Sequence, residues 1–129
     1  MMKVIALLAL LTFVTISFPK FCLAEETTEY MLAVLNAHPK IIERDDITIT
    51  RFRYLLQNIR SNTKDKPTDK GMGSAILYMR DELQKKYGVK INLLEFTEGL
   101  NKFLNDRTIK PVFTEALTWY ALFYSKTLE

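Results

Sequence analysis

Apolar residues recur along this chain at the three- and four-residue spacing of amphipathic helices, and the strict alternation of a half-buried strand is rare. The pattern predicts five helices, whose expected ranges are residues 28–37, 48–62, 73–87, 93–105 and 111–126. We therefore expect an all-α fold, in which four to five helices form one small bundle.

The segment 48–62 has the most regular helical pattern. Its apolar side chains fall within one stripe about 120° wide at 100° per residue, and they are Ile49, Phe52, Leu55, Leu56 and Ile59. Asp45 and Asp46 precede the stripe, and short acidic side chains are frequent at helix N-caps. This stripe is expected to face the core.

The segment 111–126 has an unusually wide apolar surface. Close to half of its circumference is covered by Val112, Phe113, Ala116, Leu117, Trp119, Tyr120, Phe123 and Tyr124, while Thr114, Glu115, Thr118, Ser125 and Lys126 are left for water. Such an arc favours a helix at the centre of the bundle, with Trp119 and Phe123 helping to fill the core.

The other helices are bounded by turn residues. The segment 61–73 is polar and contains Pro67 and two glycines, so it predicts the longest loop. Gly88 is expected to end a helix in the left-handed conformation, and Asn92 followed by Glu95 resembles a capping box. Gly99 inside a helix indicates close approach of a neighbouring helix. The inward set of helix 28–37 is expected to be Tyr30, Met31, Val34 and Leu35.

The first 24 residues match a cleavable secretory signal. Lys3 precedes an apolar stretch over 4–18, and Cys22 and Ala24 place small side chains where a signal peptidase reads. We expect cleavage after Ala24 and one helical domain over 25–129. The alternatives are a retained membrane anchor, for which the stretch is too short, and acylation at Cys22.

Removal of this signal changes the charge and the available chemistry. Of the 18 lysines and arginines, Lys3 and Lys20 lie in the signal, and the remaining 16 against 15 acidic residues give a net charge of +1. This near-neutral balance argues against nucleic acid as a partner and against binding to a lipid surface. The only cysteine is Cys22, so the expected mature chain has no thiol chemistry.

Catalytic and metal-binding patterns are weak. His38 is the only histidine, which is too few for a metal site, and no cofactor motif occurs. Glu95 and Glu98 have the i,i+3 spacing that a helix-borne pair of catalytic carboxylates would need, and they support the alternative of a small hydrolase. We expect no catalytic residue, because Glu95 reads as part of a cap and Glu98 as a surface partner of Lys102.

Four residues of the helix 48–62 form a candidate partner-binding ridge. Arg53, Gln57 and Arg60 follow i,i+4,i+7 spacing beside Tyr54, and two guanidinium groups there suit a carboxylate or phosphate of a partner. The alternative is that the arginines cover apolar surface and pair within the chain, with Glu25, Glu43 or Asp46.

Two strings, Arg-Phe-Arg-Tyr-Leu-Leu at 51–56 and Leu-Leu-Glu-Phe-Thr-Glu-Gly-Leu-Asn at 93–101, resemble segments of small secreted helical proteins of bacteria that carry no assigned activity. The resemblance implies a bacterial periplasmic address and assigns no role to any residue.

The sequence thus predicts an exported helical protein, periplasmic or extracellular. We expect a non-enzymatic protein-binding module, such as an inhibitor, an immunity-type protein or an adaptor, whose partner is another exported protein. After cleavage it would keep no stable membrane anchor.

Overall fold

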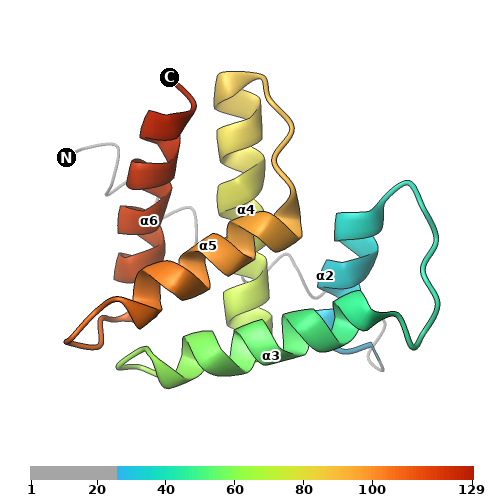
Figure 1. Cartoon of the computed structure of the whole chain (residues 1–129), viewed down its shortest axis with the longest axis horizontal. Helices are drawn as coiled ribbons and strands as arrows, with labels where there is room; N and C mark the ends of the chain where they lie inside the picture. Colours follow the sequence, from blue (N-terminus) through green and yellow to red (C-terminus); the bar gives the residue numbers. More distant parts are fainter. Residues whose placement is uncertain (1–25) are drawn as a thin grey trace.

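A computed structural model describes residues 26–129, which form five α-helices and no strand (Figure 1). The helices are α2 (Thr28–Ala37), α3 (Ile47–Ser61), α4 (Asp69–Tyr87), α5 (Leu93–Asn105) and α6 (Phe113–Thr127). The predicted all-α fold is confirmed. The predicted signal peptide, with its cleavage after Ala24 and the alternatives at Cys22, lies outside the described residues.

Helices α4 and α5 form the centre of the bundle, since each contacts the other four helices. Figure 1 shows α5 crossing in front of α4, with α6 beside α4 and with α3 and α2 at the other end. Helix α6 packs mainly against α4 and α5. The prediction that the last helix is the central one is therefore wrong, because its wide apolar arc has neighbours on only part of its circumference.

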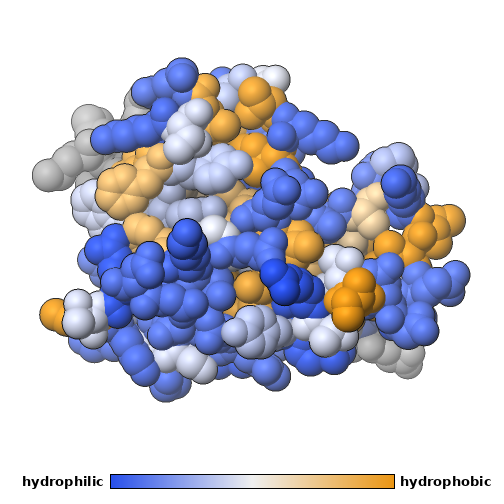
Figure 2. All heavy atoms as spheres, viewed as in Figure 1, coloured by the Kyte–Doolittle hydropathy of each residue, from blue (hydrophilic) through white to orange (hydrophobic). Residues whose placement is uncertain are grey.

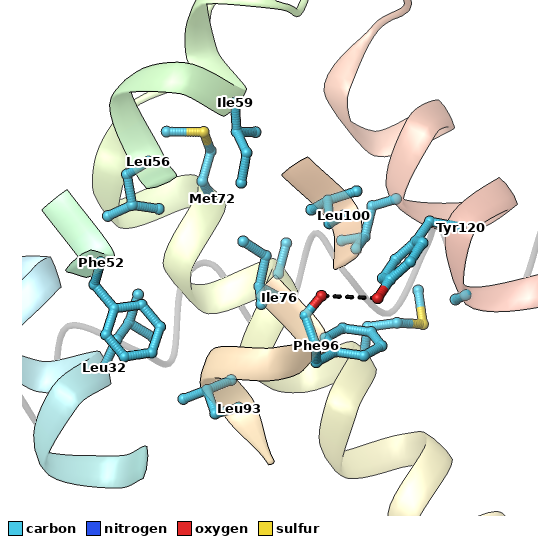
Figure 3. Packing of buried hydrophobic residues seen from close by; sticks show 14 of the residues in the cluster. Leu32, Phe52, Leu56, Ile59, Met72, Ile76, Leu93, Phe96, Leu100 and Tyr120 are labelled. Atoms are coloured by element: carbon cyan, nitrogen blue, oxygen red, sulfur yellow. Dashed lines mark hydrogen bonds between the residues drawn. The ribbon is translucent and has the colours of Figure 1, made fainter. Parts of the chain in front are cut away.

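The core consists of one apolar cluster to which all five helices contribute (Figure 3). All five apolar residues of the predicted α3 stripe are buried. All of them except Leu55 belong to the same cluster as side chains of the two central helices, whose fully buried residues include Met72, Ile76, Met79, Leu93, Phe96, Leu100 and Leu104. The stripe predicted from periodicity is thus confirmed.

Helix α2 turns a different face to the core than we predicted. Leu32 and Ala33 are fully buried, whereas the predicted set of Tyr30, Met31, Val34 and Leu35 is only partly buried. The helix lies against α3, α4 and α5, so its orientation is set by three neighbours rather than by its own apolar stripe.

Helix α4 begins four residues earlier than its predicted start at 73. Its N-cap is Thr68, whose Oγ1 accepts a hydrogen bond of 3.1 Å from Gly71 N. The predicted loop over 61–73 therefore shortens to 62–68. Gly73 lies inside the helix at the point where α2 approaches. A Cβ atom at this position would lie 2.5 Å from Thr28 Cγ2, so the close approach needs a residue without a side chain.

The remaining turn signals are confirmed. Gly88 ends α4 with φ at 65°, and Asn92 Oδ1 accepts a hydrogen bond of 2.9 Å from Glu95 N at the start of α5. At the start of α3, Asp46 Oδ1 accepts one of 2.8 Å from Thr48 N. These local contacts explain why several helix ends could be predicted from the sequence.

The cap of α3 should make stability depend on pH. The hydrogen bond from the Thr48 backbone lowers the pKa of the Asp46 carboxyl below its ordinary value of 3.8. A carboxyl with a lowered pKa in the folded state stabilises the fold above the unfolded pKa, and this contribution is lost as the pH falls through the folded pKa. The substitution Asp46→Asn keeps a side-chain oxygen that can cap the helix but removes the carboxyl group that ionises.

We therefore expect the melting temperature of the wild type to exceed that of Asp46→Asn at neutral pH, and the difference to shrink as the pH falls below 3.8. Thermal unfolding followed by circular dichroism across this range measures the difference. A difference that stays constant with pH would contradict the role of the carboxylate.

Candidate functional site

The candidate ridge on α3 is partly occupied by contacts within the chain. Arg60 Nε donates a hydrogen bond of 2.9 Å to Pro67 O, and its Nη2 contacts the Asp69 carboxylate. Arg53 Nε lies 3.4 Å from an oxygen of Glu29, whose side chain is nearly buried. Both arginines thus pair within the chain, although with acids other than Glu43 and Asp46, while Glu25 lies outside the described residues.

The other two residues of the ridge remain accessible. Gln57 is exposed, and Tyr54 is 59% exposed. Arg60 is held against the start of α4. The parts of the ridge that a partner could contact are therefore Tyr54, Gln57 and the exposed half of Arg53.

The two glutamates of α5 serve different contacts. Arg51 Nε donates a hydrogen bond of 2.9 Å to Glu98 Oε2, which ties α3 to α5. Glu95 is exposed and lines a hollow beside α2 and α4, and Glu98 is not among the residues that line it. The arrangement does not bring the two carboxylates to one cavity.

An exposed group of aromatic side chains lies between α5 and α6. Trp119 is 53% exposed and Phe123, one turn later on the same side of α6, is 48% exposed. Their ring centroids are 6.5 Å apart, and the Phe123 ring lies 5.8 Å from that of Phe103 on α5. We call Phe103, Trp119 and Phe123 the aromatic face. The prediction that Trp119 and Phe123 fill the core is therefore wrong.

The physical reason is that α6 is covered on one side only. Helices α4 and α5 cover the side that carries Phe113, Ala116, Leu117, Tyr120 and Ala121. At 100° per residue, Trp119 and Phe123 fall beyond that side. The side that the neighbouring helices cover includes Thr118 and is therefore rotated relative to the apolar arc, which leaves the edge with Trp119 and Phe123 in water.

Two hollows adjoin the aromatic face and share the side chains of Phe103 and Phe123. The larger has a volume of about 410 Å³ and is lined by Phe103, Arg107, Ile109, Pro111, Glu115, Ala116, Trp119 and Phe123. The smaller has about 290 Å³ and is lined by Gly99, Lys102, Phe103, Asp106, Tyr120, Phe123, Tyr124 and Thr127. Figure 2 shows apolar atoms over α6 in this region.

The charged groups around the aromatic face are of both signs. The Arg107 guanidinium lies over the Phe103 ring at 4.2 Å from its centroid, a cation–π contact. Lys102 lines the smaller hollow with Asp106, and Glu115 lines the larger one. Aromatic residues and arginine are enriched at the centres of protein–protein interfaces, whereas lysine and acidic residues lie at the rims.

The floor of the aromatic face is fixed by Tyr120. Its hydroxyl donates a hydrogen bond of 2.8 Å to Phe96 O (Figure 3). Its ring lies 5.9 Å from that of Phe103. Burial raises the pKa of the Tyr120 hydroxyl far above its ordinary value, with a smaller contribution from Tyr124. The hydroxyl therefore stays protonated and keeps α6 attached to α5.

Residues 26–129 contain neither a metal-binding cluster nor a membrane-spanning helix. No group of three or more His, Cys, Asp or Glu side chains in this part of the chain could hold a metal ion. None of the described helices has both the length and the apolar character needed to cross a membrane.

Comparisons of the chain with protein-family models, with curated proteins and with solved structures gave no match.

Proposed function

We propose that this protein is an exported, non-enzymatic binding module that recognises another exported protein through the aromatic face. The observation that carries the proposal is the half-exposed pair Trp119 and Phe123, which lies beside Phe103 and is flanked by Arg107. The export part rests on the signal-like sequence over 1–24.

The energetics of exposure support a binding role. Burying a Phe side chain completely is worth about 1.5–3 kcal/mol relative to leaving it exposed. The half of Phe123 and Trp119 that faces water would supply part of this free energy when a partner covers it. Because Tyr120 anchors α6 to α5 beneath the rings, the helix that carries Trp119 and Phe123 would lose little conformational entropy when a partner binds.

The arrangement of carboxylates favours binding over the alternative of a small hydrolase. A hydrolase of the kind suggested by Glu95 and Glu98 needs both carboxylates in one cavity. Glu98 instead pairs with Arg51, and Glu95 lines a hollow without it.

Capture of partners should therefore depend on the aromatic face. The full-length chain is expressed with a C-terminal tag, purified as the cell processes it, immobilised and exposed to other exported proteins. We expect Trp119→Ala/Phe123→Ala to reduce the capture of specific partners at least tenfold, about 1.4 kcal/mol, as measured by quantitative mass spectrometry. The intact mass of the bait reports whether the chain begins at Glu25.

The matched control is Tyr54→Ala/Gln57→Ala, which removes two exposed side chains of the α3 ridge. It should capture the same partners as the wild type. If this variant lost the partners while Trp119→Ala/Phe123→Ala kept them, the ridge would be the binding surface. Equal capture by all three proteins would remove both surfaces from consideration.

A further inference from the structure

The largest of the three hollows described for this protein shares no lining residue with the two that adjoin the aromatic face. Its volume is about 710 Å³, and it opens where the C-terminal end of α2, the second half of α4 and the turn into α5 meet. Figure 1 shows this turn beside the C-terminal end of α2, and the outline of the molecule in Figure 2 is indented between them. The lining residues used below are Leu35, Pro39, Arg80, Lys90, Leu93 and Glu95.

Arg80 is a well-positioned cation in this hollow. Its side chain is only 14% exposed, its Nη1 donates a hydrogen bond of 3.1 Å to Ile91 O, and its Nε lies 2.8 Å from Asp81 Oδ1. Gln84 also stabilises the turn between α4 and α5, because its Oε1 accepts a hydrogen bond of 2.9 Å from Ile91 N. The contacts with Ile91 and Asp81 thus hold the Arg80 guanidinium in one orientation against the turn between α4 and α5.

Part of this guanidinium is still available to a ligand. Nη2 of Arg80 takes part in no hydrogen bond among residues 26–129, and the side chain lines the hollow. An arginine fixed by other contacts loses little freedom when it binds an oxyanion. The network therefore leaves one guanidinium nitrogen, Nη2, to donate to a carboxylate oxygen in the cavity.

The charges around the hollow define the kind of anion. Asp81 compensates part of the charge of Arg80, while Lys90 is exposed and forms no ion pair within the described part of the chain. Glu95 lines the same hollow and would repel a second negative charge. A singly charged group fits this balance better than a phosphate dianion does.

The hollow also offers apolar contact. Leu35 on α2 is partly buried, Pro39 just after α2 is exposed, and the fully buried Leu93 lies beneath the surface of the hollow. The backbone amides at the start of α5 are already bonded, since Leu94 N donates to Asn36 Oδ1 and Glu95 N to Asn92 Oδ1. Recognition would therefore depend on side chains and not on the helix end.

We propose that this hollow is a binding site for a small organic carboxylate, whose carboxyl group pairs with Arg80 and Lys90 and whose apolar body packs on Leu35 and Pro39. The site is separate from the aromatic face and does not depend on the proposed protein-binding function.

The test uses hexanoate as the probe and hexanamide as its neutral match, added to the purified ¹⁵N-labelled protein at neutral pH. Chemical-shift titration should give saturable changes at the backbone amides of Lys90 and Ile91 with hexanoate. Hexanamide should bind at least about tenfold more weakly, because it lacks the charge that strengthens the hydrogen bonds.

Two substitutions locate the interaction. Lys90→Gln changes an exposed side chain and should weaken hexanoate binding about fivefold, whereas the matched Lys102→Gln on the aromatic side should leave it unchanged. Arg80→Lys keeps the charge but removes the fixed Nη2 donor, and it should weaken binding further if the protein remains folded. The absence of saturable shifts, equal shifts with hexanamide, or shifts confined to α6 would each overturn the proposal, and Lys90→Gln keeps the test decisive even if Arg80→Lys does not fold.

Discussion

Replacing Phe96 by alanine is expected to lower the free energy of unfolding by about 3–5 kcal/mol, the usual loss when a buried phenylalanine is truncated. Phe96 is fully buried on α5, and its ring lies 5.1 Å from that of Tyr120 and 5.2 Å from that of Tyr124. Truncation would leave a cavity between α5 and α6 that these fixed rings cannot close. Urea denaturation of the purified variant measures the loss.

Phe123→Ala is the matched control, since it removes the same side chain from the surface of α6. Its 48% exposure places much of the ring in water, so we expect a loss of less than about 1 kcal/mol. If Phe123→Ala destabilised the protein as much as Phe96→Ala, the aromatic face would belong to the core, and the binding proposal would lose its support.

Helix positions were predictable where local chemistry determines them. The bounds of α2 and α5 agree with the predicted ranges, and the ends of α3 differ by one residue. Asp46, Gly88 and Asn92 act within a few residues of themselves, so the sequence carries the whole signal. Gly73 shows the limit: its neighbour Thr28 comes from another helix, and the sequence predicts the start of the helix at this glycine, four residues too late.

The burial of individual α6 residues could not be predicted from polarity. The pattern predicts that Thr118 faces water, but the residue is buried. Its hydroxyl donates a hydrogen bond of 2.8 Å to Thr114 O in its own helix, so burial does not leave the hydroxyl without a partner. The adjacent Trp119, assigned to the core, is half exposed. Which residues of a wide apolar arc are buried depends on where the neighbouring helices lie, and periodicity does not contain that information.

Polar contacts between helices could not be predicted from the sequence either. Four asparagines join α3 to α5, with the amide of Asn58 bonded to Asn101 and Asn105 and the amide of Asn62 bonded to Asn105 at 2.9 Å. Nothing in the spacing of these residues indicates that they meet. The same holds for the pairing of Arg60 with Asp69, which is why the candidate ridge contained residues that the fold uses internally.

The close approach predicted at Gly99 is confirmed, and it leads to the second large effect. Alanine usually stabilises an exposed helix by about 1 kcal/mol relative to glycine. At Gly99 a Cβ atom would lie 2.1 Å from Tyr120 Oη and 3.0 Å from Cζ. The hydroxyl cannot move away without losing its hydrogen bond to Phe96 O. We therefore expect Gly99→Ala to lower the free energy of unfolding by about 1–3 kcal/mol through overpacking, and by about 1 kcal/mol more if the hydrogen bond is lost.

A double-mutant cycle with Tyr120→Phe separates this contact from other effects of the alanine. Tyr120→Phe removes the oxygen that a Cβ atom at Gly99 would meet first and leaves the ring in place. Gly99→Ala should therefore destabilise the Tyr120→Phe protein by at least about 1 kcal/mol less than it destabilises the wild type, as measured by urea denaturation of all four proteins. An equal loss in both backgrounds would mean that the hydroxyl is not the obstacle. A favourable effect of alanine in the wild type would mean that α5 and α6 do not approach each other at Gly99, and the floor of the aromatic face would then be looser than the Tyr120 hydrogen bond indicates.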